Sequence, residues 1–322
     1  MRFVVYGVGA IGGTLAARLA ASGAEVAGIA RGAQLEALRR DGLLLRTPDG
    51  AQRHAFPVVA HPREVELRPD DVILLAMKSQ DTVAALEALA SAGARDQAIV
   101  CAQNGVDNER QALRRFANVY AMLVVMPATF MRAGEVAVFG APNAGLFDVG
   151  RYPSGIDATV AALVAALTRA GFAAFATERT MEAKYGKLLV NLANVIDAAS
   201  AGGEDTAGLI ERARREGEAV LRAAGIAFAD VGPDNARRRS LMQPQPVAGA
   251  ERVGSSSRQS LLRGAGSIET DYLNGEVVLL GRLHGVPTPV NAGLCRLGRL
   301  LLSGQRPAGG LRLNEIESII SG

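Results

Sequence analysis

The chain has 322 residues, of which 49% are hydrophobic and 21% are charged; this is the balance of a folded protein with a sizeable core, not of a disordered or coiled-coil chain. The formal net charge of +3 is too small and too dispersed to indicate a nucleic-acid-binding protein. Two cysteines and three histidines without ligand-like spacing predict neither a disulfide framework nor a metal site.

The same sequence features favour a soluble protein of the cytoplasm. Glycines interrupt the N-terminal apolar stretch, which argues against a signal peptide, and the longest nearly apolar run, 119–131, is too short to span a bilayer. Cys101 lies in an apolar strand pattern, so packing is its expected role. The arginine-rich stretches 212–215 and 237–239 lack interleaved aromatic residues, which favours solvated helix faces. We therefore expect no nucleic-acid and no membrane partner.

The first half of the chain alternates short apolar runs with helical segments. The apolar runs predict strands at 3–6, 26–29, 72–76 and 99–102, and the segments between and after them predict helices at 14–22, 34–40, 81–91 and 108–116. Such alternation predicts a parallel sheet covered by helices on both faces. The elements expected next are strands at 119–125, 135–139, 145–149 and 173–175 and a helix at 158–170, with 135–139 and 145–149 favouring an antiparallel edge.

After about residue 176 the strand pattern disappears. Helices are expected at 180–201, 207–223, 256–263, 271–284 and 291–302, with a Pro-rich loop at 242–249. A switch of this kind indicates a domain boundary. The predicted fold is therefore α/β, with an N-terminal Rossmann-type parallel-sheet domain over 1–175 and an all-α C-terminal domain over 176–322.

The N-terminal glycines form a GxGxxG motif in a strand-turn-helix context. Gly7, Gly9 and Gly12 follow the first predicted strand and open the first predicted helix, with Ala10 and Ile11 between them. In this motif the first glycine permits a tight turn, the second lets a pyrophosphate approach the backbone, and the third lets helix and strand pack closely. The helix N-terminus faces the phosphate. The segment therefore predicts a dinucleotide-binding unit.

The residue after the second strand indicates which dinucleotide binds. NAD-binding proteins usually carry an acidic residue there, which holds the ribose 2′-hydroxyl. Here the position is Arg31, whereas Glu25 lies at the opposite end of the strand. A guanidinium suits the 2′-phosphate of NADP, so NADPH is the predicted cofactor. The alternative is an arginine of an exposed loop without a ligand.

Polar residues follow two further strands at the carboxyl edge of the predicted sheet, where ligands of open α/β sheets bind. Lys78 follows the strand at 72–76, and Asn104 follows the strand at 99–102. Lys78 is a candidate to contact the cofactor or an anionic substrate, and Asn104 to bond the nicotinamide or a substrate carbonyl. The alternative for each is an ordinary loop residue.

The helical domain carries a second group of candidates. Lys187 and Asn191 are four residues apart and share one face of an apolar helix, so each needs a polar partner. A structural ion pair and a ligand cleft are equally compatible with this pattern. Further along, Ser257 opens a helix, and Glu269 precedes a residue, Thr270 or Asp271, that is expected to cap another.

Together these residues resemble the ketopantoate reductase (2-dehydropantoate 2-reductase) family. The matching segments, in the family's order and at about its spacing, are GVGAIG at 7–12, Arg31, MKSQ at 77–80, QNG at 103–105, KLLVN at 187–191, Ser257, ETDYLNG at 269–275 and HGVPTPVN at 284–291. The resemblance implies a Rossmann domain, a helical domain and an active site in the cleft between them. It implies reduction of ketopantoate to pantoate by NADPH, in pantothenate biosynthesis, and leaves a homodimer open as the oligomeric state.

The resemblance also implies residue roles. Lys187 would be the general acid, and Asn104 would position nicotinamide and substrate. Asn191, Ser257 and Glu269 would bind the substrate, and Lys78 would lie near cofactor and substrate. This agrees with the chemistry, because hydride transfer to a ketone develops negative charge on oxygen that a nearby ammonium stabilises and protonates.

Three positions depart from the family pattern. Val195 stands where a second Asn is common, with Asn194 about 100° away on an ideal helix, and Leu261 and Ile268 replace polar residues. These departures surround the substrate and leave the cofactor motifs intact. Two alternatives therefore stay open: a family-related reductase of a different small keto acid, and a non-catalytic NADPH-binding sensor.

Overall fold

The computed structural model describes residues 1–322, and the chain forms two compact units. The first comprises Met1–Lys184 and Pro233–Arg252, and the second comprises Tyr185–Gly232 and Val253–Gly322. The sequence-based boundary follows residue 175, whereas the units divide inside helix α6 (Thr180–Asn191). The difference arises because α6 begins in the first unit, where the Lys184 ammonium bonds the carbonyl oxygen of Gln103 at 3.0 Å.

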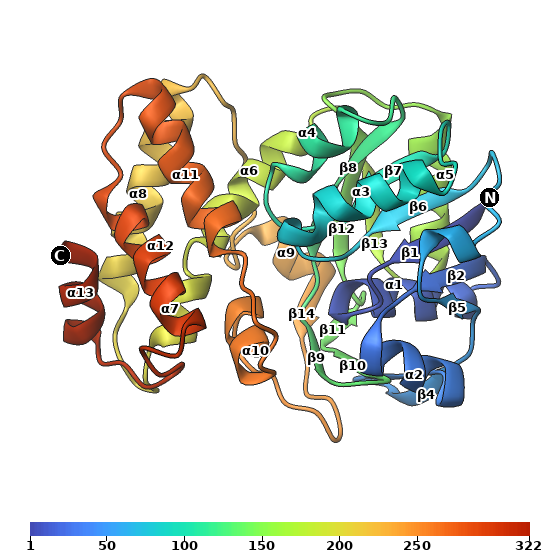
Figure 1. Ribbon diagram of the computed structural model, residues 1–322, viewed down its shortest axis with the longest axis horizontal. Coiled ribbons are helices and arrows are strands. Elements are labelled where there is room, and N and C mark those ends of the chain that lie inside the picture. Colours follow the sequence, from blue (N-terminus) through green and yellow to red (C-terminus); the bar gives the residue numbers. More distant parts are fainter. The chain divides into compact units, whose positions relative to one another are not determined.

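The first unit is built on an eight-stranded sheet (Figure 1). Its strands, in spatial order, are β13 (Ala173–Ala176), β12 (Leu146–Arg151), β8 (Val119–Val125), β7 (Ala98–Cys101), β6 (Val72–Leu75), β1 (Arg2–Tyr6), β2 (Glu25–Ile29) and β5 (Val58–Val59). All neighbours are parallel except β12 and β8. The predicted parallel sheet is confirmed. The antiparallel pairing expected for 145–149 is confirmed by β12 and β8, but its place at the edge is wrong, because β12 lies inside the sheet between β8 and β13.

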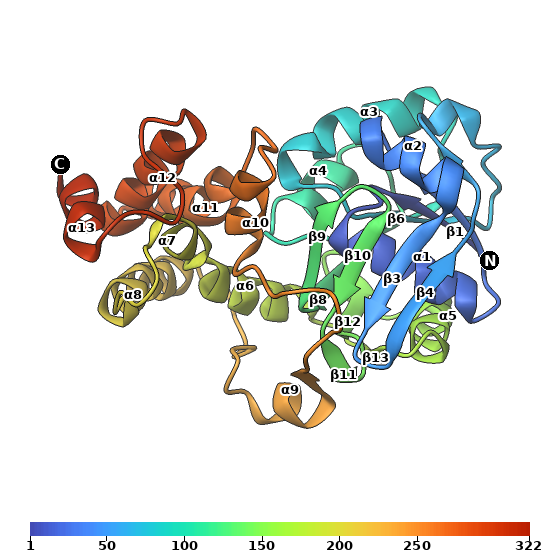
Figure 2. The same cartoon turned by 90° about the horizontal axis from the view of Figure 1, so that it is seen from below.

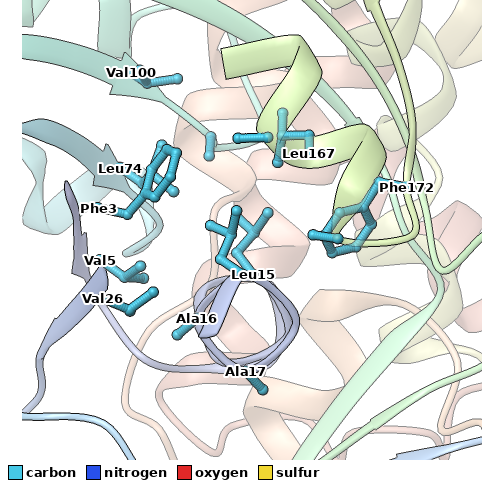
Figure 3. Close-up of a cluster of buried hydrophobic side chains, with 14 of the residues drawn as sticks. Phe3, Val5, Leu15, Ala16, Ala17, Val26, Leu74, Val100, Leu167 and Phe172 are labelled. Carbon is cyan, nitrogen blue, oxygen red and sulfur yellow. The ribbon is translucent and has the colours of Figure 1, made fainter. Parts of the chain in front are cut away.

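Helices cover both faces of this sheet. Successive side chains of a strand point to opposite faces, and the apolar strands therefore have side chains to bury on each face. On one face, α1 (Ala10–Ala21) and α5 (Ala158–Arg169) pack with Val5 and Phe3. Figure 3 shows Leu15 of α1 and Leu167 of α5 pointing into this cluster. On the other face, α3 (Thr82–Ser91) and α4 (Asn108–Leu113) pack with Val4 and with Cys101. Cys101 is buried, as predicted.

A second, smaller sheet packs against α1 on the side away from the large sheet (Figure 2). Its strands are β4 (Gly50–His54), β3 (Leu43–Thr47), β10 (Glu135–Val138) and β9 (Ala128–Arg132), and helix α2 (Gly32–Asp41) precedes β3. A Cβ on Gly13 of α1 would lie 3.1 Å from Val136 and 3.3 Å from Leu43, so the packing is close. Of these strands the sequence predicted only the one at 135–139.

The segment Pro233–Arg252 belongs to the first unit and is not the plain loop that was predicted for 242–249. It forms α9 (Ala236–Leu241) and β14 (Met242–Pro244), which pairs with β11 (Gly140–Pro142). Arg237 bonds both oxygens of Asp148 at 2.9 and 2.6 Å and lies 4.5 Å from the ring centroid of Phe175. Arg237 therefore holds the segment to the sheet and is more than a solvated side chain.

The second unit is helical, as predicted. Beyond the last part of α6 its helices are α7 (Asn194–Ala199), α8 (Ala207–Ala223), α10 (Ser256–Leu262), α11 (Thr270–His284), α12 (Pro289–Leu302) and α13 (Leu313–Ser321) (Figure 1). The single helix predicted over 180–201 is wrong, since a turn at 192–193 separates α6 from α7. None of the helices has the length and apolar character needed to cross a membrane.

Candidate functional site

The glycine motif adopts a phosphate-binding geometry at the carboxyl end of β1. Gly7 has φ +98°, and a Cβ there would lie 2.7 Å from the Met77 nitrogen, so only glycine fits. A Cβ on Gly12 would lie 2.0 Å from the Gly7 carbonyl oxygen, which explains why α1 can begin so close to the strand. A Cβ on Gly9 would meet no protein atom within 4 Å. The backbone at Gly9, directly before the N-terminus of α1, is thus open to a ligand, and the motif fits a dinucleotide pyrophosphate.

Arg31 stands at the end of β2, where a Rossmann fold meets the adenosine ribose. It is the residue before α2, and its side chain is 83% exposed. Its guanidinium is paired with the carboxylate of Asp81, with both oxygens 3.2 Å from Nη2. The Arg31 side chain thus has an acidic partner that the sequence analysis did not identify.

The loops that carry Lys78 and Asn104 are joined by a buried polar network. Lys78 precedes a short 3-10 turn, η2 (Ser79–Asp81), after β6. The Asn108 amide donates to Ser79 Oγ at 3.2 Å and to the Asn104 carbonyl oxygen at 2.9 Å. These bonds hold the residue that follows Lys78 and the carbonyl of Asn104 to one side chain, so neither loop is an independent surface loop.

A second part of the network is joined to the first through Asn108. The Gln103 amide donates to Thr82 Oγ1 at 2.8 Å and to the Met77 carbonyl oxygen at 3.0 Å, and Thr82 donates to Asn108 Oδ1 at 2.8 Å. The network therefore connects the loop after β6 to the loop after β7 through side chains that are themselves buried. Such networks are rigid when their members are bonded.

A buried ion pair completes this edge of the first unit. The Lys184 ammonium contacts the Glu109 carboxylate and bonds the carbonyl oxygens of Gln103 and Cys101 at 3.0 and 3.5 Å. The two charged side chains are 2% and 0% exposed. Burial raises the pKa of Glu109, and the charge of Lys184 opposes that rise. Lys184 thus fixes the backbone that leads into Asn104.

In the second unit, Lys187 and Asn191 lie one turn apart on α6. Lys187 is partly exposed and Asn191 is buried. The sequence analysis placed Asn194 and Val195 on the same continuous helix as Lys187, about 100° apart. Because α6 ends at Asn191 and a turn follows, that helical geometry does not relate either residue to Lys187. Asn194 instead begins α7, where its amide lies 3.5 Å from Ser256 Oγ.

Ser257 is buried at the start of α10, and this helix is held against α7. Ser255 donates from its backbone nitrogen to Asp197 at 2.7 Å and from its hydroxyl to the Asn194 carbonyl oxygen at 2.9 Å. Arg258 donates to the Asp197 carbonyl oxygen at 3.0 Å. These hydrogen bonds, with that of Asn194 to Ser256, set the position of Ser257 relative to the helix that follows Lys187 and Asn191.

Glu269 is buried at the start of α11, one residue before the helix. This helix is fixed to the end of α6 by Asn274, which donates to the Leu192 carbonyl oxygen at 3.1 Å and to Asn291 Oδ1 at 3.0 Å. Asn291 in turn donates to Glu216 at 2.9 Å. The Asn residues of the two C-terminal motifs are thus scaffold residues, whereas Glu269 stands at the start of a helix.

The structure groups the predicted residues by unit. Those predicted to bind cofactor lie at the carboxyl ends of β1, β2, β6 and β7, and Lys187, Asn191, Ser257 and Glu269 lie on three helices of the second unit. Asp81, Glu109 and Lys184 were not identified as site residues. For Lys184 a signal existed: the chain has 35 basic residues but only three lysines, and two of them were already candidates.

Comparisons with known proteins match this arrangement. A family model described as ketopantoate reductase PanE/ApbA matches residues 3–153, and one described as ketopantoate reductase PanE/ApbA C terminal matches residues 180–301. The 2-dehydropantoate 2-reductase of Halobacterium salinarum is 32% identical over 93% of this chain and 98% of that protein. That of Mesorhizobium japonicum is 31% identical over 93% of this chain and 98% of its own length.

Solved structures are similar over the whole chain as well. A PanE/ApbA family ketopantoate reductase from Ralstonia eutropha has a TM-score of 0.77 at 27% identity and covers 95% of this chain and 99% of its own. D-mandelate dehydrogenase in a ternary structure with NADH and anilino(oxo)acetate has a TM-score of 0.78 at 23% identity, covering 94% and 99%. The second likeness, at this identity, is one of fold alone.

Proposed function

Because this chain belongs to the ketopantoate reductase family and is thereby an oxidoreductase acting on CH–OH groups, we propose that it reduces a 2-keto acid with NADPH, and that its substrate is ketopantoate, which it converts to pantoate. In this reaction the keto acid, NADPH and one proton give the 2-hydroxy acid and NADP⁺. The observation that carries the proposal is that Lys187 and Asn191 share one face of α6. The glycine loop of the first unit, which is open at Gly9, supports the cofactor part of the proposal.

The first unit would hold the cofactor. Gly7, Gly9, Ala10, Ile11 and Gly12 form the pyrophosphate loop, and Arg31 at the end of β2 is suited to the 2′-phosphate. Asn104 and Lys78 lie at the ends of β7 and β6, with backbones fixed by the polar network. When bound, the nicotinamide supplies the hydride.

Lys187 is the proposed proton donor. As the substrate's carbonyl carbon gains the hydride, its oxygen gains negative charge, which an ammonium stabilises and then neutralises by transferring a proton from Nζ. The neutral amine regains that proton from solvent. General-acid catalysis of this kind contributes about 10²- to 10⁴-fold in rate. Replacing Lys187 with Ala should therefore lower kcat by about that factor while NADPH affinity stays nearly unchanged.

The residues proposed to bind substrate favour a keto acid with a hydroxyl group. Asn191 and Ser257 can each donate a hydrogen bond to a carboxylate or carbonyl oxygen. The carboxylate of Glu269, buried at the start of α11, can only accept, so it would bind a hydroxyl group and repel a second carboxylate. Ketopantoate, with one carboxylate and one primary hydroxyl, satisfies this set.

The test is NADPH oxidation with ketopantoate beside 2-ketoisovalerate, which lacks the hydroxymethyl group, and a set of other small 2-keto acids. Faster turnover of ketopantoate in the wild type, with the advantage lost in Glu269→Gln, is the expected result. Turnover of another acid alone would support the alternative reductase, in which Val195, Leu261 and Ile268 shape a different pocket. NADPH binding without turnover of any keto acid would contradict catalysis and favour a sensor.

A further inference from the structure

An acidic side chain faces the arginine that is proposed to bind the 2′-phosphate of NADPH. Both carboxylate oxygens of Asp81 lie 3.2 Å from Nη2 of Arg31. The Arg31 side chain is 83% exposed and that of Asp81 is 36% exposed, so a ligand can reach both. A carboxylate at this place is unexpected for a site that must accept a phosphate dianion.

Asp81 is not placed there by the needs of its own helix. It occupies the N-cap position of α3, where an aspartate usually accepts a hydrogen bond from the first turn, but its side chain makes no capping bond. It is directed instead at Arg31, fifty residues earlier in the chain. Substitution by asparagine should therefore leave α3 intact.

The pair spans the carboxyl end of β1. In the sheet β1 lies between β2, which leads to Arg31, and β6, which leads to Asp81. Tyr6 ends β1 between them: burial raises its pKa, while the charge of Arg31 lowers it and that of Asp81 raises it. Both charges thus act at the carboxyl end of β1, beside the end of β2 where a Rossmann fold receives the adenosine ribose.

The two forms of the cofactor meet this pair differently. An exposed ion pair contributes little to stability, so a 2′-phosphate can take Arg31 from Asp81. The phosphate then lies beside an unpaired carboxylate of its own sign. A ribose 2′-hydroxyl is neutral and can donate a hydrogen bond to that carboxylate, as the acidic residue of NAD-binding folds accepts one.

We propose that Asp81 is a specificity-determining residue, which moderates the preference of Arg31 for NADPH and gives the enzyme a usable affinity for NADH. This inference rests on the proposed function in one respect: the adenosine end of a nicotinamide dinucleotide lies at Arg31. It requires neither a particular keto acid nor a role for Lys187.

The experiment measures equilibrium binding and not turnover. Adenosine 2′,5′-bisphosphate and 5′-AMP are titrated by calorimetry into wild type, Asp81→Asn and Asp81→Ser, and NADPH and NADH follow. In both Asp81 variants the 2′-phosphorylated ligand should bind about 3- to 10-fold more tightly, and its advantage over the unphosphorylated ligand should widen by about tenfold, which corresponds to 1.4 kcal/mol. The gain should shrink at high salt.

Glu87→Gln is the matched control. Glu87 lies on α3 and pairs with Arg115 at 3.0 Å, so the variant changes net charge by the same amount without altering the Arg31 pair. Its ligand preference should equal that of the wild type. A preference that shifts equally in Glu87→Gln and Asp81→Asn would overturn the inference, because the effect would then be one of net charge.

Two further outcomes separate this inference from the proposed function. If both nucleotides bind the wild type but the Asp81 variants keep its preference, Asp81 has no role in specificity and the proposed function stands. If neither nucleotide binds the wild type, the proposed function itself is wrong and the inference falls with it. Unfolding midpoints of the variants, measured alongside, should match that of the wild type.

Discussion

Replacing Lys184 with Met should destabilise the first unit to a degree that depends on pH. The substitution removes the cation that faces Glu109, whose side chain is 0% exposed, and the donor to the carbonyl oxygens of Gln103 and Cys101. Removing one partner of a buried ion pair typically costs about 3–5 kcal/mol, because the other charge stays buried without compensation. We expect a loss of this size in the free energy of unfolding at about pH 8.

The sign of the pH dependence follows from Glu109. Burial already raises its pKa, and Lys184 opposes the rise, so the pKa rises further in the variant. A group whose pKa is higher in the folded state binds its proton more tightly there, and its contribution to stability is present at low pH and lost as pH rises. The deficit of the variant relative to the wild type should therefore be smallest at acidic pH, where Glu109 is protonated in both folded proteins. Above the folded-state pKa of Glu109 in the wild type it should grow by about 1.4 kcal/mol per pH unit, until Glu109 is ionised in the folded variant as well.

Urea unfolding followed by circular dichroism at several pH values measures this deficit. The matched control is the double variant Lys184→Met with Glu109→Gln, which loses the same hydrogen bonds to the two carbonyl oxygens but contains no buried carboxylate. Its stability relative to the wild type should not show a deficit that grows with pH. A single variant whose deficit is the same at all pH values, or follows that of the double variant, would refute the reasoning.

Two other predictions concern the glycine loop and the cysteines. Gly9→Ala should keep the unfolding midpoint of the wild type, since its Cβ meets no protein atom within 4 Å, but should weaken NADPH binding because the Cβ occupies the space left open to the ligand. Gly12→Ala should destabilise the fold, since its Cβ would lie 2.0 Å from the Gly7 carbonyl oxygen. Equal unfolding midpoints for the two variants would contradict this. Cys101 and Cys295 are buried, and burial raises the pKa of Cys295 to about 12 and that of Cys101 well above its usual range. A thiol reagent should therefore leave both cysteines unlabelled in the native protein at neutral pH and label both after unfolding. Rapid labelling of either cysteine in the native protein would show that its thiol is not buried.

What the sequence could predict about the fold was carried by local signals. The glycine motif, the strand that precedes it and the helix that follows are contiguous, and their geometry is fixed by backbone sterics that each glycine relieves. The hairpin of β3 and β4 also had a local signal, the turn residues Pro48, Asp49 and Gly50, but a strand pattern was not recognised beside them. Its outer strand, β4, is exposed along most of its length, so it lacks the apolar run that identified the buried strands.

The features that the sequence could not predict depend on contacts between distant residues. The turn after Asn191 contains neither glycine nor proline; it occurs where Asn274, eighty-two residues later, donates to the Leu192 carbonyl oxygen. The pairing of Asp81 with Arg31 and of Lys184 with Glu109 likewise joins separate loops and helices. Neither periodicity nor motif spacing contains information about such pairs, so the candidate site was identified residue by residue without the partners that hold it in place.

The rarity of lysine in this chain leads to a last prediction, for Lys187. All but three of the 35 basic residues are arginines, and the exceptions are Lys78, Lys184 and Lys187. At Lys184 burial explains the choice, because a compact ammonium fits where its side chain is 2% exposed. Lys187 is only partly buried, so space does not exclude a guanidinium there. The proton-donor role proposed for Lys187 would exclude it, because an ammonium can give up its proton and regain it, whereas a guanidinium stays protonated.

The variant Lys187→Arg therefore separates charge from proton transfer. It keeps a cation able to stabilise the developing oxyanion, so substrate KM should change little. It lacks a transferable proton, so kcat should fall by about 10²-fold or more and approach that of Lys187→Ala. A kcat within a few fold of the wild type would mean that Lys187 acts only as a charge and that the proton comes from another group or from water.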